Sequence, residues 1–310
     1  MSTPRLSLVI FVLFVGCLCV TMLLHFSDLA DDVVTVSRVA AVKMPNLLSK
    51  KALFMLRLVM LSVNLLATGL KLVDSEQRTH AHKPESKLKP RVNIYIHGPM
   101  WISFFTVQSW LLQLFFLSGA TICSYLDLHP GLAMDLGTAL PTALWMAYEV
   151  SFAVAILVSS IVKYVLIPTV LANGESVDSF FIPCDLLMHN ANVLFMALEL
   201  LFNDLPFRLA HFPLAALWGL NYVVFSWVWL AISGICWYDF LDPTLPNAIV
   251  IHTVLIVVLG AFFAIGSGLA TGAAAIESPY LRVAITLTGV ASVCKTGFIT
   301  GIPKPAPKTE

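Results

Sequence analysis

The chain has 310 residues, of which 58% are hydrophobic and only 12% are charged. Soluble domains carry about 25% charged residues, so this chain could not cover a water-exposed surface with polar groups. Eighteen Lys and Arg residues balance eighteen Asp and Glu residues, which excludes the basic excess of nucleic-acid-binding proteins. The composition therefore predicts an all-α fold, an integral membrane helical bundle with about seven to eight hydrophobic segments.

Residues 1–93 hold two hydrophobic segments and the one long polar stretch inside the chain. Residues 6–25 are long enough to cross a bilayer, which needs about 20 apolar residues. We favour an uncleaved anchor over a signal peptide there, because acidic residues and no Ala-x-Ala-like site follow. Residues 52–73 form the second segment, and the polar loop at 74–93 contains five Lys and Arg residues.

Six further apolar runs follow the polar loop. Each run is too long for a buried strand, and turn-forming pairs such as Asp242-Pro243 separate them. We expect a membrane-embedded helical core at 94–276, followed by an extra hydrophobic segment and a short polar tail at 277–310. The six runs lie at 101–123, 140–166, 180–202, 212–237, 248–275 and 280–302.

Basic residues in the loops give the expected orientation. They concentrate in the 74–93 loop, and the tail adds Lys304 and Lys308, which places both regions in the cytosol. Residues 38–51 contain four more basic residues and cannot lie on that side if 52–73 crosses once. We therefore expect one N-terminal segment to be re-entrant or to lie on the surface. The endoplasmic reticulum and the plasma membrane suit the sequence equally.

Familiar catalytic and metal-binding signatures are missing from the sequence. The six cysteines lack Cys-x-x-Cys spacing and sit in or beside apolar runs, so we interpret them as packed free thiols. The sequence has no zincin, nucleophile-elbow or phosphate-loop motif. It therefore predicts no metal, no cofactor and no nucleic-acid partner. The bilayer and a lipid substrate are the expected partners, and the oligomeric state stays open.

The 180–202 run carries the most informative polar residues, because ionisable groups at membrane depth are costly and face the interior of a bundle. A regular α-helix would place four of them near one face: Asp185, His189, Asn192 and Glu199. We expect this face to line a polar cavity. A carboxylate one turn from an imidazole suits the base and its orienting group in nucleophilic catalysis. The alternative is a polar network that only holds helices together.

A nucleophile would have to come from another helix. The start of the 101–123 run offers three hydroxyls, those of Ser103, Thr106 and Ser109. Spacing alone does not select one of them, because Ser and Thr in membrane helices usually bond to the carbonyl group four residues earlier.

Three stretches resemble the androgen-inducible family of multipass membrane proteins. Residues 104–116, FFTVQSWLLQLFF, resemble the second-span signature of that family. The run from His189 to Glu199 resembles its histidine-centred span. Residues 222–241, which end in GICWYDFL, resemble its G-x-x-x-Y-x-F-L stretch. The three matches occur in the family's order and cover about residues 95–275.

The resemblance implies a threonine hydrolase of the bilayer that cleaves fatty acid esters of hydroxy fatty acids. The nucleophile and the catalytic histidine of the family would fall on Thr106 and His189. His189 would take the proton of Thr106, and we expect Asp185 to orient the ring and Asn192 to donate to the oxyanion. Glu199 would support the same face. The family often has a second histidine where this chain has Leu186.

Two other functions stay open from the sequence. A transporter or proton-coupled carrier would use the ionisable residues of the spans, although the chain shows no internal repeat. A non-catalytic regulatory membrane protein would need the polar face only for helix packing. The residues that a carrier would use are Glu149, Asp185, His189, Glu199 and His252.

Overall fold

The fold is known from a computed structural model that describes residues 3–26, 33–80, 92–132, 134, 136–172, 174 and 176–295. It is an all-α bundle, which confirms the fold predicted from the sequence. Seven of the described helices are long and apolar enough to cross a membrane. They are Leu6–His25, Lys50–Val73, Phe105–Leu128, Ala139–Ala172, Pro183–Phe202, Leu209–Ser233 and Ala248–Ala275.

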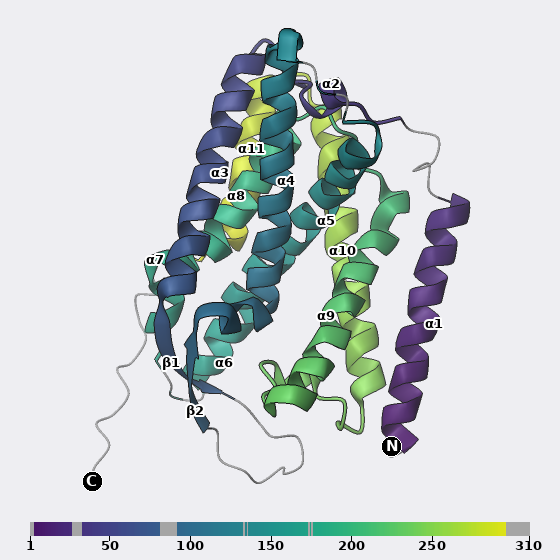
Figure 1. Cartoon of the computed structure of the whole chain (residues 1–310), viewed down its shortest axis with the longest axis vertical. Coiled ribbons are helices and arrows are strands. Elements are labelled where there is room, and N and C mark those ends of the chain that lie inside the picture. The colour runs from purple at the N-terminus through teal and green to yellow at the C-terminus, as the bar shows by residue number, and fades with distance from the viewer. Residues whose placement is uncertain are drawn as a thin grey trace.

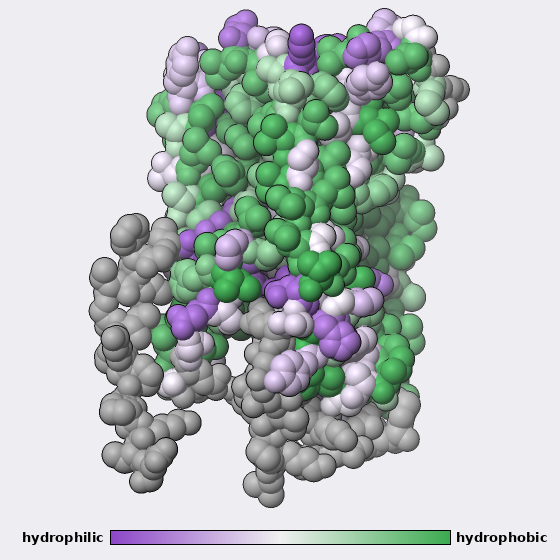
Figure 2. Space-filling view, turned by 60° about the vertical axis from the view of Figure 1, so that its left-hand side comes forward, coloured by the Kyte–Doolittle hydropathy of each residue, from purple (hydrophilic) through white to green (hydrophobic). Residues whose placement is uncertain are grey.

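Figure 1 shows the long helices packed side by side, and Figure 2 shows hydrophobic residues over most of the bundle's side. The helices of the bundle are α1 (Thr3–Phe26), α3 (Lys50–Val73), α4 (Phe105–Leu128), α5 (Ala139–Ile161), α6 (Ile167–Ala172), α7 (Pro183–Leu186), α8 (Asn192–Phe202), α9 (Phe212–Ser233), α10 (Ala248–Ala275) and α11 (Pro279–Val293). Two π-helical turns interrupt the spans, η3 (Val162–Leu166) and η5 (Leu187–Ala191). The remaining short helices are α2 (Val36–Val39), η1 (Gly98–Ser103), η2 (Pro130–Leu132), η4 (Asp178–Phe181), η6 (Leu209–His211) and η7 (Asp239–Leu241).

The two N-terminal segments are continuous helices. The basic residues at 38–51 predict that one segment re-enters or lies on the surface. Both segments form uninterrupted 24-residue helices, α1 and α3, so neither re-enters within its described residues, and the surface-lying arrangement stays a prediction. Ser49 caps α3 by accepting a hydrogen bond from the Ala52 N–H (3.2 Å). Helix α3 packs along α4, whereas α1 lies at the periphery against α9 (Figure 1).

The last hydrophobic segment is shorter than the sequence suggests. Helix α11 has 15 residues, fewer than the roughly 20 that cross a bilayer at right angles. Ser278 caps its first turn through the Leu281 N–H (3.4 Å). The expected run continued to residue 302, and residues 296–302 lie outside the described part of the chain, as does the polar tail.

A small β-hairpin stands where the sequence predicts only a polar loop. Strands β1 (Ser75–His80) and β2 (Val92–His97) pair in antiparallel register, from Ser75 opposite His97 to His80 opposite Val92. The hairpin joins the end of α3 to the start of α4. Strand β1, SEQRTH, is polar throughout and gives no alternation of hydrophobic residues, whereas β2, VNIYIH, alternates but has only six residues.

Close packing of α4 against α5 depends on one glycine. A side-chain carbon at Gly119 would lie only 2.3 Å from the Leu144 Cδ2 atom. Leu144 is itself fully buried. The absence of a side chain at Gly119 therefore lets the two helices approach, as small residues do in membrane bundles generally.

A buried ion pair ties α3 to α8. The Arg57 guanidinium donates two hydrogen bonds to the Glu199 carboxylate, at 2.8 and 2.7 Å, and both side chains are 0% exposed. Arg57 also donates to the Ser124 hydroxyl (2.7 Å), and the Asn203 amide donates to Glu199 (3.0 Å). This geometry satisfies both charges inside the bundle, where an unpaired charge would be strongly unfavourable.

Candidate functional site

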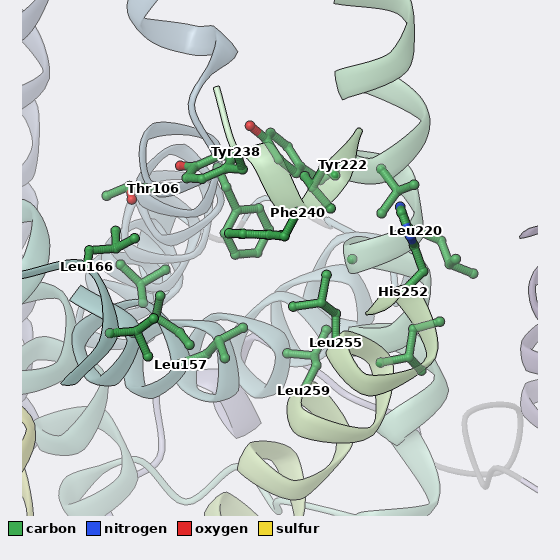
Figure 3. A pocket seen from close by; sticks show the side chains of 18 of the residues that line it. Thr106, Leu157, Leu166, Leu220, Tyr222, Tyr238, Phe240, His252, Leu255 and Leu259 are labelled. Atoms are coloured by element: carbon green, nitrogen blue, oxygen red, sulfur yellow. The ribbon is translucent and has the colours of Figure 1, made fainter. Parts of the chain in front are cut away.

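A largely apolar cavity of about 260 Å³ lies between the start of α4 and helices α5, α9 and α10. Aliphatic side chains such as Leu157, Leu255 and Leu259 form much of its wall (Figure 3). The few polar groups of the wall belong to Thr106, Tyr222, Tyr238 and His252. Apolar walls with a few convergent polar groups are the usual form of a small-molecule site.

Thr106 contributes a hydroxyl group to this wall. It is the second residue of α4 and is half-buried. The carbonyl group four residues earlier, that of Ile102, accepts a hydrogen bond from the Gln108 side chain (3.1 Å). Among the described residues the Thr106 hydroxyl has no hydrogen-bond partner.

Other hydroxyls of the spans contrast with Thr106. Ser109 and Thr121 lie on the same helix and donate to the carbonyl groups four residues earlier, at 2.8 and 2.6 Å. Thr253 on α10 does the same (2.8 Å). This back-bonding is the normal arrangement in a membrane helix, and the hydroxyl of Thr106 lacks it, as does that of Ser151 on α5.

His189 lies on the π-helical turn η5 and is 6% exposed. Its Nδ1 atom lies 2.9 Å from the Lys295 ammonium nitrogen, which also donates to the Phe180 carbonyl group. An ammonium group can only donate, so Nδ1 accepts the hydrogen bond and the neutral ring carries its proton on Nε2. Lys295 therefore orients the His189 ring.

The structure does not join Thr106 to His189. No hydrogen bond links these two described residues, and His189 is not among the residues that line the apolar cavity. Helix α5 contributes to both places, since Val158 lines the cavity while Ser159 donates to the His189 carbonyl group. A direct proton transfer from Thr106 to His189 thus requires a different arrangement of these side chains from the one in this structure.

The other three residues of the expected polar face have separate partners. Asp185 forms an ion pair with Lys71 (3.1 Å), Asn192 Oδ1 accepts from Ser159 (3.2 Å), and Glu199 pairs with Arg57. None of the three lines the apolar cavity. These contacts therefore do not form the single polar cavity that we expected along this helix.

The π-helical turn explains why the four residues separate. Each π turn inserts one residue into an α-helix and rotates everything after it. The turn at Leu187–Ala191 lies between Asp185 and Asn192, so an α-helical wheel misplaces them relative to one another. A second π turn, Val162–Leu166, forms part of the cavity wall. Such turns occur frequently at functional sites.

His252 is the only imidazole among the described residues that line the cavity. Its Nδ1 atom lies 2.6 Å from the Ala248 carbonyl oxygen, which fixes the proton on Nδ1. Its buried Nε2 atom has no hydrogen-bond partner among the described residues. Figure 3 shows Thr106 and His252 on opposite sides of the cavity. Tyr238 belongs to the G-x-x-x-Y-x-F-L stretch of the sequence, whereas Lys295 belongs to no charged or repeated pattern.

Glu149 belongs to a further separate pair. Its carboxylate lies 2.7 Å from His211 Nδ1 and also accepts a hydrogen bond from the Arg208 N–H (2.7 Å).

The six cysteines are free thiols. Within the described part of the chain, no group of three His, Cys, Asp or Glu side chains could hold a metal ion.

Comparison of the chain with protein-family models, with curated proteins and with solved structures found no match. The resemblance to the androgen-inducible family therefore remains a prediction from the three stretches that carry it.

Proposed function

We propose that this protein is a membrane-embedded lipid esterase in which Thr106 is the nucleophile. The observation that carries the proposal is the Thr106 hydroxyl, which has no hydrogen-bond partner among the described residues and lies in the wall of an apolar cavity. An apolar cavity inside a membrane bundle suits an acyl chain. Esters of hydroxy fatty acids with fatty acids are the substrates that the resemblance suggests.

The proposed reaction has two steps. The Thr106 oxygen attacks the ester carbonyl carbon while a histidine takes the hydroxyl proton. The carbon–oxygen bond of the ester then breaks, and the alcohol leaves with that proton. Water cleaves the acyl-threonine ester in the second step and releases the fatty acid. No metal or cofactor is required for this chemistry.

Two histidines compete for the role of the base. His189 is favoured by the resemblance, and it would have to give up its contact with Lys295, because its Nε2 atom carries the ring proton. His252 is favoured by its place in the cavity wall and by its unpaired Nε2 atom. Hydrogen bonds of catalytic groups are often long before substrate binds, so the lack of a contact with Thr106 excludes neither histidine.

The test uses the purified protein in detergent and a fluorophosphonate probe that reacts with activated hydroxyl groups. Labelling should be lost in Thr106→Ala and retained in Thr121→Ala, a matched threonine on the same helix whose hydroxyl is engaged. His189→Gln and His252→Gln then identify the base by which of them loses labelling. Full labelling of Thr106→Ala, or of both histidine variants, would contradict the proposal.

Transport and a purely regulatory role are the alternatives. A carrier would use ionisable residues arranged as a path. Six of the ionisable residues instead form three separate pairs, which are Arg57 with Glu199, Lys71 with Asp185, and His211 with Glu149. None of their members lines the apolar cavity. No specific contact in the described residues favours either alternative over the esterase.

A further inference from the structure

A second cavity, of about 230 Å³, lies near the C-terminal ends of α8 and α10. One buried water needs roughly 10–15 Å³ of such space, so the cavity can hold a group of several atoms. Three charged side chains line it, those of Arg38, Lys43 and Asp204. Their charge sets this cavity apart from the apolar one beside Thr106.

Lys43 is held in place by its backbone. Its N–H group donates to the Phe202 carbonyl oxygen (2.9 Å), and the Asp204 N–H donates to the Ala41 carbonyl oxygen (3.2 Å). The half-buried Lys43 ammonium group makes no hydrogen bond to a described residue. A cation without a hydrogen-bond acceptor is a favourable partner for an anion.

Positive charge exceeds negative charge around Lys43. Asp204 is already engaged, because Arg38 donates a hydrogen bond to its carboxylate (2.6 Å). Burial lowers the pKa of Lys43, the nearby charge of Arg282 lowers it further, and Asp204 opposes this shift. Two cations and one carboxylate thus line the cavity, and a third cation, Arg282, acts on Lys43.

Tyr148 supplies an independent sign of a binding site. It comes from α5, it is only 1% exposed, and it nevertheless lines the cavity. Its hydroxyl group has no hydrogen-bond partner among the described residues. Buried tyrosine hydroxyls normally find a partner, so a ligand that accepts a hydrogen bond would complete this environment.

We propose that this cavity binds the phosphate group of an anionic lipid, held by Lys43 and Arg38 and accepting a hydrogen bond from Tyr148. The cavity lies where spans end, and a basic pocket between membrane helices can bind an acidic lipid headgroup. A phosphate oxygen can accept from both cations and from the hydroxyl group. The proposal does not depend on the chemistry of Thr106.

The test measures lipid binding by native mass spectrometry of the protein in detergent. The probes are phosphatidic acid, phosphatidylcholine with the same chains, and inorganic phosphate. Phosphatidic acid should bind at least about ten-fold more tightly than phosphatidylcholine, whose choline offsets the phosphate charge. Lys43→Gln should weaken phosphatidic acid binding at least about five-fold. Lys51→Gln removes an exposed charge at the start of α3 and should leave phosphatidic acid binding unchanged.

Tyr148→Phe keeps the proposal testable if Lys43→Gln does not fold. It removes one hydroxyl group and should weaken phosphatidic acid binding about three-fold. Equal binding of the two lipids by the wild-type protein would overturn the proposal, as would equal losses in Lys43→Gln and Lys51→Gln. Binding of inorganic phosphate without a preference for phosphatidic acid would contradict the proposal that the ligand is a lipid. It would support a soluble phosphate ligand at the same residues.

Discussion

The buried ion pair between α3 and α8 and the apolar cavity beside Thr106 differ in how their polar groups are hydrogen-bonded. Arg57 and Glu199 are 0% exposed, and each has several hydrogen-bond partners. Thr106 is half-buried and has none among the described residues. Both regions contain polar groups inside a membrane bundle, yet only one of them leaves a reactive group unengaged.

The difference separates structural polar groups from candidate chemical ones. A buried polar group that is fully hydrogen-bonded stabilises one arrangement of helices, and removing one partner is costly. A hydroxyl group that faces a cavity without a partner contributes little to stability and is free to react. Stability measurements should therefore respond to the first region, and activity measurements to the second.

Arg57→Met should give the largest effect on stability. It leaves the Glu199 carboxylate buried without its cation, which should lower the free energy of unfolding by about 3–5 kcal/mol. Denaturation in mixed micelles measures this change. Replacing Glu199 with Met as well should restore much of the loss. Equal destabilisation of the single and double variants would argue against a paired role.

Gly119→Val should destabilise the contact between α4 and α5. The added side chain would collide with Leu144, and overpacking of this kind lowers the free energy of unfolding by about 1–3 kcal/mol. Gly69→Val on α3 is the matched control, because nothing lies within 4 Å of a side-chain carbon there. The same denaturation assay should show little change for the control, and similar losses in both variants would refute the packing argument.

Lys295→Met tests whether the contact with Lys295 withholds His189 from the reaction. If His189 is the base, loss of this hydrogen bond frees Nδ1 to accept the Thr106 proton and should raise kcat about three-fold with little change in KM. Lys295→Arg, which keeps a donor at this position, should stay near the wild-type rate. Steady-state hydrolysis of a long-chain ester measures both constants, and an unchanged kcat would remove Lys295 and His189 from the proposed reaction.

Gln108→Leu should give the smallest effect. It frees the Ile102 carbonyl group, to which Thr106 could then donate as other threonines do. Probe labelling of Thr106 should slow about three-fold, while the unfolding midpoint changes little. Faster labelling of Gln108→Leu would show that the Gln108 contact does not keep the hydroxyl available.

The sequence predicts the helical spans well, because a bilayer demands apolar segments of a given length. It does not predict the partners of the polar residues. Arg57 and Glu199 are 142 positions apart, and Lys71 and Asp185 are 114 positions apart, so packing rather than local spacing brings them together. A helical wheel also could not anticipate the π turn at His189, which depends on contacts with neighbouring helices.

Thr106 itself shows both the value and the limit of sequence reasoning. The stretch at 104–116 singles out Thr106 through a resemblance, while its spacing alone does not distinguish it from Ser103 or Ser109. The structure adds the distinguishing fact, since Ser103 and Ser109 donate to backbone carbonyl groups and Thr106 does not. The pairing of Thr106 with His189 is suggested only by the resemblance, and the structure shows no hydrogen bond between the two side chains.

Identifying the residue that carries the covalent adduct tests the central proposal most directly. The protein is labelled with a fluorophosphonate probe in detergent, digested, and analysed by peptide mass spectrometry. The proposal predicts a phosphonate adduct on the Thr106 hydroxyl, and no adduct in the Thr106→Ala variant. An adduct on Ser103 or Ser109 instead, or an unlabelled protein that still hydrolyses long-chain esters, would contradict it.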